Sequence, residues 1–363
     1  MARVGGDEFV IILPLCGSAE EVLAFASRIL EKVREPITLA GQVIRPSICI
    51  GVPFESAEQL LTDGADRLIA NADLALLVAK GRGSGEVEIF NNQMARSATE
   101  RLSLLSAMGE SIENNDFVLH FQPIVDVVDP ARLRGFEGLL RWENQGRPIG
   151  PDVFIPLAER SGVIGRLTSI VITQGIRQLS IWRSEGVIGD DVTISLNVSG
   201  HDLRSPNLIA QIAGALSTFN VPAESVHLEL TESSSIDVGS VLETLNALRS
   251  LGVGLSIDDF GTGYASLSYL RDLPATIVKI DQSFTRNIAD VRDRSLIAAS
   301  IAMGHQLGME VIAEGVETTD QLARLVELGC DMAQGYLISR PMAAAAVPIW
   351  IAEHTTMHDL VNA

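Results

Sequence analysis

The sequence is short of several kinds of residue, and each shortage narrows the range of functions. Only three of its 363 residues are cysteines, Cys16, Cys49 and Cys330, an odd number at scattered positions. This pattern argues against a disulfide framework and fits a reducing compartment. The six histidines do not cluster along the chain, so a zinc site built from histidine and cysteine is not expected.

Basic residues and long apolar runs are also scarce. Lys and Arg number 27 against 46 Asp and Glu, which gives a net charge of −19 and a pI of about 4.7. A DNA-binding surface is therefore disfavoured, although a small anionic ligand can still bind through metal ions. No apolar run approaches the roughly 20 residues of a membrane span, and nothing near Arg3 resembles a signal peptide. We therefore expect a cytoplasmic protein whose chain makes no membrane contact.

The first 90 residues show a short alternation of strands and helices. Residues 4–13 are expected to start in a turn that contains Gly5-Gly6-Asp7-Glu8 and to continue as a buried strand. Two acids after two glycines suit either a turn that binds phosphate and metal or the tip of a β-hairpin. Further helices are predicted at 19–34 and 57–80 and further strands at 44–52 and 87–90. The polar residues 91–97 are interpreted as a linker into a helix at 100–115.

A longer and more regular pattern follows. Eight apolar stretches are predicted to be strands: 117–125, 134–142, 192–198, 226–231, 253–258, 276–281, 310–315 and 332–338. Helices are predicted between most of them, at 167–185, 208–219, 238–251, 294–307 and 319–328. This alternation predicts a (β/α)₈ barrel of the TIM type. The first two strands should pair antiparallel, because the connection between them is too short for a parallel crossover. The alternative is an open doubly wound sheet, although its first strand–helix turn lacks a glycine-rich dinucleotide fingerprint.

Polar residues interrupt or follow seven of these apolar strands. They are Glu137, Asn197, Glu229 with Glu232, Asp258 with Asp259, Lys279 with Asp281, Glu314 with Glu317, and Gln334. Any one of them taken alone is best explained as a structural ion pair or a solvated turn residue. Barrel strands, however, bring their carboxyl ends to one mouth. Carboxylate and amide oxygens suit Mg²⁺ or Mn²⁺, and two such ions with a lysine can activate water against a phosphodiester.

These motifs carry two family resemblances. The stretch Gly5-Gly6-Asp7-Glu8-Phe9, with Ala72-Asp73-Leu74-Ala75 further on, resembles the C-terminal half of a GGDEF (diguanylate cyclase) domain. From about Glu100 to Ala363 the chain resembles EAL-domain cyclic-di-GMP phosphodiesterases. We therefore expect a truncated α+β GGDEF fragment over 1–92, inactive as a cyclase, and an EAL barrel over 98–363.

The EAL resemblance implies hydrolysis of cyclic di-GMP to linear pGpG with two Mg²⁺ or Mn²⁺ ions. The alternative is a receptor that binds cyclic di-GMP without cleaving it. The implied ligands of the first ion are Glu137, Asn197, Glu229 and Asp258, and Asp258 and Asp259 would hold the second. Lys279 would contact the attacking water, and Glu314 would assist as acid or base.

The same resemblance implies roles for residues around the ions. The implied substrate contacts are Gln122, Leu139, Arg141, Asp281 and Gln334, of which Gln334 would also support the water shell of the second ion. Glu232 would anchor the loop after Asp259, which lies near the usual contact of a homodimer. One departure is visible, because Gly138 replaces the alanine of the family's Glu-Ala-Leu motif. Loss of a methyl group is expected to loosen this strand slightly while leaving every ligand in place.

Overall fold

The computed structural model describes residues 1–13, 17–54, 57–231, 238–261 and 273–361. The chain divides into two compact units, Met1–Ser106 and Ala107–Ala363. Among the described helices, none combines the length and the apolarity needed to cross a bilayer. The domain limits 1–92 and 98–363 remain a prediction.

Eight strands of the second unit form a closed barrel. They are β7 (Phe117–Asp126), β8 (Leu133–Asn144), β10 (Thr193–Asn197), β11 (Val226–Thr231), β12 (Gly254–Phe260), β13 (Ile277–Ile280), β14 (Glu310–Ala313) and β15 (Met332–Ala333). Neighbours from β8 round to β15 run parallel, whereas β7 pairs antiparallel with both β8 and β15 and so closes the ring. The predicted barrel and its antiparallel first pair are confirmed. Two short strands pair antiparallel with this ring: β9 (Arg147–Ile149) pairs with β8, and β16 (Met342–Ala343) pairs with β7.

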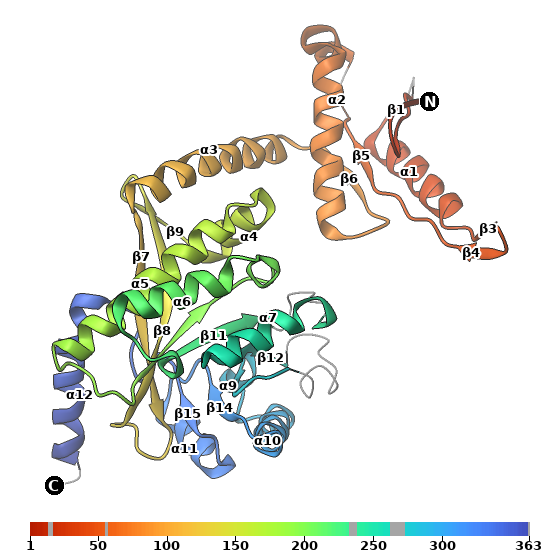
Figure 1. Cartoon of the computed structure of the whole chain (residues 1–363). Coiled ribbons are helices and arrows are strands. Elements are labelled where there is room, and N and C mark those ends of the chain that lie inside the picture. Colours follow the sequence, from red (N-terminus) through yellow and green to blue (C-terminus); the bar gives the residue numbers. More distant parts are fainter. Residues whose placement is uncertain (14–16, 55–56, 232–237, 262–272, 362–363) are drawn as a thin grey trace. The chain divides into compact units, whose positions relative to one another are not determined.

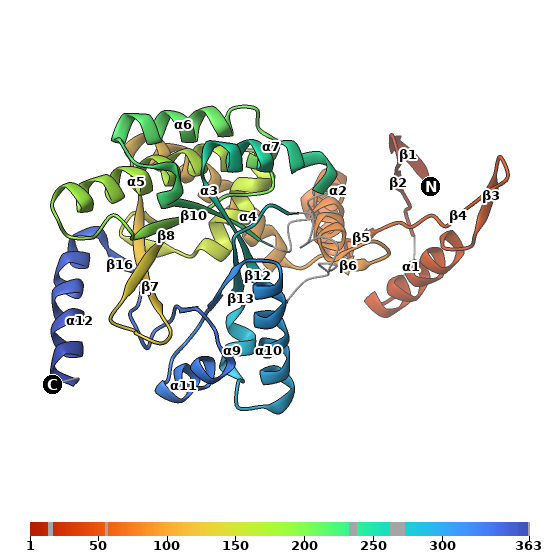
Figure 2. The ribbon, with the colours of Figure 1, turned by 60° about the horizontal axis from the view of Figure 1, so that its bottom comes forward.

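Helices cover the outside of these strands, as Figures 1 and 2 show for α5, α6, α7 and α10. The helices of this unit are α4 (Pro151–Ser161), α5 (Ile164–Ser184), α6 (Leu208–Phe219), α7 (Val238–Leu251), α9 (Gln282–Arg286), α10 (Val291–Gln306), α11 (Thr319–Leu328) and α12 (Val347–Val361). Helix α5 buries a full apolar face that ends in Trp182, whose ring lies 4.7 Å from that of Phe121. The sequence analysis missed α4, which has Pro156 in its interior, where proline is unusual.

The last predicted strand, 332–338, is wrong beyond Ala333. A Cβ added at Gly335 would lie 2.2 Å from the backbone nitrogen and oxygen of Val316, so only glycine allows this close approach. Val316 N–H donates to the carbonyl of Gln334 at 3.0 Å, which fixes the turn. Gln334 therefore stands just past the carboxyl end of β15, as Glu314 does past β14.

The first unit has a much smaller folded core. Its parallel pair β5 (Ile50–Val52) and β6 (Val87–Ile89) packs against α1 (Ala19–Val33) and α2 (Ala57–Arg82). Strands β1 (Ala2–Gly5) and β2 (Glu8–Val10) form a hairpin, so the hairpin interpretation of the glycine–acid motif is confirmed. The expected burial of this strand is wrong, because Phe9 is 57% exposed.

Two further predictions in this region are wrong. The strand expected at 44–52 is divided between β4 (Gln42–Ile44), which pairs with β3 (Ile37–Leu39), and β5. Pro46 lies between β4 and β5 and has no backbone N–H for a continuous ladder. The linker expected at 91–97 is instead the start of α3 (Asn92–Asn114). The Asn91 side chain accepts a hydrogen bond from Met94 N–H at 3.1 Å and so begins the helix as an N-cap.

Candidate active site

Lys279 on β13 is fully buried at the centre of a cluster of carboxylates. Its Nζ lies 2.6 Å from Glu314 Oε1, 2.8 Å from Glu229 Oε2, 3.1 Å from Asp258 Oδ1 and 3.2 Å from Glu137 Oε2. Burial opposes the charged form of the lysine, but these carboxylates outweigh it and raise its pKa well above the usual value. Lys279 is therefore held as an ammonium group that faces four strands of the barrel.

Side-chain amides complete the environment of Glu137 on β8. Asn197 Nδ2 donates to Glu137 Oε1 at 2.9 Å, and Gln334 Nε2 donates to Glu137 Oε2 at 2.7 Å. Gln334 Nε2 also lies 3.1 Å from its second acceptor, Gln122 Oε1. Burial favours the protonated form of Glu137, but Lys279 and both amides outweigh it and lower its pKa. Five residues that the sequence analysis predicted for the site therefore meet in one hydrogen-bond network. They are Gln122, Glu137, Asn197, Lys279 and Gln334.

Asp258 and Asp259 occupy an irregular part of β12. The register with β13 shifts between Ile257 and Phe260, and Asp259 has a left-handed φ of 56°. In a regular strand, neighbouring side chains point to opposite faces, whereas a bulge redirects one of them. Oxygen atoms of Asp258, Asp259 and Glu314 accordingly lie within 4.8 Å of one another. Burial and then the neighbouring Asp258 raise the pKa of Asp259 to about 6.

The cluster has the composition of a divalent-metal site. Oxygen atoms of Glu137, Glu229 and Asp258 also lie within 4.8 Å of one another, so Asp258 is common to both groups. Among the described residues, the buried Glu229 Oε1 has no hydrogen-bond partner and keeps its lone pairs for another ligand. Burial, followed by the charge of Glu137, raises the pKa of Glu229 well above its usual value. Buried carboxylates that outnumber their one ammonium group favour binding of a hard cation.

The substrate contacts predicted from the sequence lie on different elements, some on β8 and one at the start of α9. Leu139 and Arg141 follow Glu137 at alternate positions of β8 and so share its face. Arg141 is half-buried, and its pKa is lowered by burial against the opposing effects of Glu137 and Tyr336. The Asp281 carboxylate caps α9 by accepting a hydrogen bond from Ser283 N–H at 3.0 Å, and its contact with a substrate stays a prediction. Glu232 lies outside the described residues.

Gly138 is well packed, and the slight loosening of its strand stays a prediction. A Cβ built on Gly138 would lie 2.9 Å from Leu196 Cδ2, and one built on Gly175 would lie 2.5 Å from the same atom. The Leu196 side chain therefore occupies the space beside both glycines. Leu196 directly precedes the predicted ligand Asn197, and nothing in the sequence indicates that its side chain fills this space.

The sequence analysis also missed a buried polar group that lies five residues after Asn197 in the chain. Asp202 is 4% exposed, and Thr168 on α5 and Ser199 after β10 both donate to its Oδ2. The spacing Ser199-x-x-Asp202 is that of a helix capping box, and this pattern could have identified the pair.

Comparisons with known proteins agree with both resemblances. Residues 105–341 match the family described as EAL domain, and residues 1–86 match the family described as diguanylate cyclase, GGDEF domain. The chain is 36% identical over 349 residues to the bifunctional diguanylate cyclase/cyclic di-GMP phosphodiesterase MucR of Pseudomonas aeruginosa, covering 95% of this chain and 50% of MucR. It is 33% identical over 355 residues to the cyclic di-GMP phosphodiesterase PdeR of Escherichia coli, covering 96% and 52%. The chain thus spans about half the length of these curated relatives.

Solved structures support the fold of the second unit. A structure of the PaMucR phosphodiesterase in complex with c-di-GMP aligns with a TM-score of 0.64 and 38% identity, covering 68% of this chain and 99% of that one. The EAL domain of FimX from Pseudomonas aeruginosa, bound to c-di-GMP, aligns with a TM-score of 0.59 and 26% identity, covering 67% and 95%.

Proposed function

Because this chain belongs to the EAL domain family, we propose that it hydrolyses one phosphodiester bond of cyclic di-GMP and releases linear pGpG. The observation that carries the proposal is the contact of Lys279 Nζ, at 2.6–3.2 Å, with three carboxylates on β8, β11 and β12 and a fourth just past β14. MucR and PdeR are both described as cyclic di-GMP phosphodiesterases, and this similarity supports cyclic di-GMP as the substrate.

The donor set fits two divalent ions, and we propose Mg²⁺ or Mn²⁺. Glu137, Asn197, Glu229 and Asp258 would hold the first ion, and Asp258 and Asp259 the second. Such ions, when bound, polarise the phosphoryl oxygens and lower the pKa of water. Gln334 would support the surroundings of the second ion while it orients Glu137, to which it donates a hydrogen bond.

The chain's own residues would position the reactants and move protons. Lys279 remains protonated, so it would donate a hydrogen bond to the attacking water and stabilise charge on the phosphoryl group. Burial is the largest influence on Glu314 and helps raise its pKa to about 8, against the effect of Lys279. A carboxyl group with this pKa holds a proton near neutral pH, so Glu314 would donate that proton to the departing 3′-oxygen as the water oxygen–phosphorus bond replaces the phosphorus–3′-oxygen bond. The proton released by the attacking water would pass to the solvent.

Substrate would be held at the rim of the barrel. The Arg141 guanidinium on the face of Glu137 suits a phosphate oxygen. Leu139 and Gln122 would contact the rest of the nucleotide. Asp281 would also contact the substrate, because it lies near Asp259.

The central experiment incubates the full chain with cyclic di-GMP and resolves the nucleotides by chromatography. We expect pGpG with Mg²⁺ or Mn²⁺ and none in EDTA. Glu137→Gln should lower turnover by about a thousandfold or more, because it removes a charged metal ligand worth several kcal/mol in the transition state. Substantial turnover in EDTA, or by this variant, would contradict the proposal.

A receptor without catalysis is the second candidate, but the described residues retain every expected metal ligand. We also propose that the first unit makes no cyclic di-GMP from GTP, because its glycine–acid motif lies on an exposed two-stranded hairpin. We expect a homodimer through the EAL domain, which light scattering of the purified chain would test, and a cytoplasmic location where the nucleotide is made.

A further inference from the structure

Asp202 is a buried carboxylate outside the proposed ligand set. It opens the single-turn helix η1 (Asp202–Arg204) after β10 and is only 4% exposed. Its Oδ2 accepts hydrogen bonds from Thr168 Oγ1 at 2.6 Å, Ser199 Oγ at 2.6 Å and Ser199 N at 2.9 Å. Burying a charge is costly unless donors satisfy it, so these three bonds define a specific arrangement.

The bonds of Asp202 fix the chain next to Asn197. Ser199 is two residues beyond Asn197, and between them Val198 N–H donates to the carbonyl of Glu229 at 3.1 Å. The backbone after Asn197 is therefore tied to β11 on one side and to Asp202 on the other. Asn197 Nδ2 is used by Glu137, which leaves the Asn197 amide oxygen as the atom able to bind a cation.

We propose that Asp202 is a positioning residue for the metal site. Through Ser199 and Thr168 it holds the end of β10 so that the Asn197 amide oxygen stays aimed at the first ion. The inference rests on the proposed function, since Asn197 is a metal ligand only within it. Partners that orient metal ligands commonly change metal affinity or activity by about 10- to 100-fold when they are removed.

A purely structural role makes a different prediction. Ser199 Oγ also accepts a hydrogen bond from Asp202 N–H at 3.2 Å, so this pair has the reciprocal bonds of a capping box. A cap alone would contribute to stability and leave ion binding unchanged. Thr168 adds a bond from α5 that a cap does not require, and it links the loop after Asn197 to the body of the barrel.

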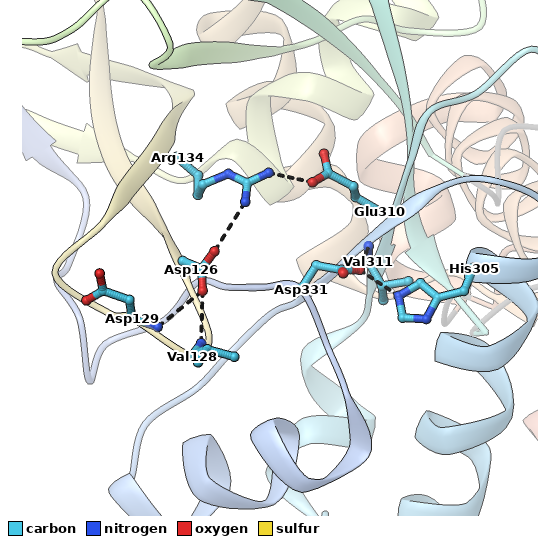
Figure 3. Close-up of polar contacts among 8 residues, drawn as sticks. All are labelled: Asp126, Val128, Asp129, Arg134, His305, Glu310, Val311 and Asp331. Atoms are coloured by element: carbon cyan, nitrogen blue, oxygen red, sulfur yellow. Dashed lines mark hydrogen bonds and ion pairs between the residues drawn. The ribbon is translucent and has the colours of Figure 1, made fainter.

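The chain offers a matched control at the opposite end of the barrel. Asp126 also accepts hydrogen bonds from three donors, Val128 N–H at 3.0 Å, Asp129 N–H at 3.2 Å and Arg134 Nη1 at 3.2 Å. Figure 3 shows these contacts around the start of β8, where Arg134 also reaches Glu310. Asp126→Ala therefore removes a comparable carboxylate far from the cluster around Lys279.

The test measures Mn²⁺ binding to the full chain by electron paramagnetic resonance, together with turnover against Mn²⁺ concentration and thermal melting. Asp202→Ala should weaken Mn²⁺ binding by about tenfold or more. Asp202→Asn keeps an oxygen acceptor and should restore binding to within about threefold of the wild type. Asp126→Ala should lower the melting temperature while its Mn²⁺ titration matches the wild type.

Equal Mn²⁺ affinity in Asp202→Ala and Asp126→Ala would overturn the positioning role. If Asp202→Ala does not fold, Thr168→Val removes one donor and keeps the carboxylate. A several-fold weaker Mn²⁺ affinity in Thr168→Val would support the inference, and an unchanged affinity would overturn it. A wild-type chain that binds no Mn²⁺ would overturn the proposed function, and this inference with it.

Discussion

Asp7 and Glu8 of the first unit lie on an exposed two-stranded hairpin, whereas Asp258 and Glu314 of the second surround a lysine that solvent does not reach. Lys80 near Glu8 is 54% exposed and 3.7 Å from it, and Lys279 is 0% exposed and 2.6 Å from Glu314. The same kinds of residue therefore interact weakly in solvent and strongly inside the barrel. A reaction that needs a charged side chain in a fixed position is therefore possible only where a packed core surrounds that side chain.

The amount of core explains this difference. Among the described residues of the first unit, the buried apolar side chains are Ala26, Leu30, Val52, Ala75 and Ala79, and three of these five are alanines. Large apolar side chains such as Phe9 and Ile12 are 57% and 80% exposed there. The barrel instead buries large aromatic side chains such as Trp142 and Trp182 at 1% exposure. So small a core is not expected to stabilise a unit of this length by itself.

The largest difference should appear when each lysine is replaced by methionine. Lys279→Met removes the one cation that contacts all four carboxyl groups, and we expect turnover to fall by about 10²- to 10³-fold. In EDTA the variant should also lose about 3–5 kcal/mol of stability, because buried charges are left uncompensated. Added Mg²⁺ should raise its melting temperature more than it raises that of the wild type. Turnover and calorimetric melting measure both effects.

Lys80→Met is the control, and it should leave turnover and melting close to the wild type. An exposed ion pair contributes about 0–1 kcal/mol. If Lys279→Met melted like Lys80→Met in EDTA, the carboxylate cluster would not depend on the lysine, and the contrast between the two units would fail.

Separating the units should give a smaller but distinct effect. A chain of residues 92–363 should melt cooperatively and turn over cyclic di-GMP within about threefold of the full chain. A chain of residues 1–91 should show no cooperative transition, and its amides should exchange quickly with deuterium, because few of them lie beneath packed side chains. Strong amide protection in 1–91 would show that the small core suffices.

The same contrast explains how much the sequence predicted. Alternating apolar strands and helices identified the barrel, because each strand must bury an apolar face whatever its neighbours are. The position of Glu137 or Lys279 followed from the rule that barrel strands end at one mouth. Strand β2 was misjudged, because an apolar sequence such as Val10-Ile11-Ile12 indicates burial only where partners exist to cover it.

Other features depend on contacts between residues far apart in the sequence, which no local sequence pattern predicts. The left-handed Asp259 needs a bulge whose position is set by the pairing of β12 with β13. The role of Asp202 depends on Thr168, which is 34 residues away. Asp281 shows a related difficulty, because its carboxylate also caps α9, a role that its place in the motif does not reveal.

The smallest expected effect concerns Gly138→Ala, which restores the alanine found in the family motif. The new methyl carbon would lie 2.9 Å from Leu196 Cδ2, so the leucine must move by a few tenths of an ångström, yet Gly175 confines it on the other side. We expect a loss of about 1 kcal/mol in the free energy of unfolding and a change in turnover of no more than about threefold. In the first unit, Gly81→Ala in α2 meets no atom within 4 Å and should not destabilise the chain.

A double substitution tests whether Leu196 is the cause. Leu196→Val shortens the side chain that fills the space beside Gly138, so Gly138→Ala should cost less in that background than alone. Residues in contact commonly show coupling of about 0.5 kcal/mol or more, and unfolding by urea of the four chains measures it. Strictly additive losses would mean that the methyl group is accommodated elsewhere. In that case the barrel around Glu137 would tolerate change as readily as the first unit does, and tight packing would not distinguish the two.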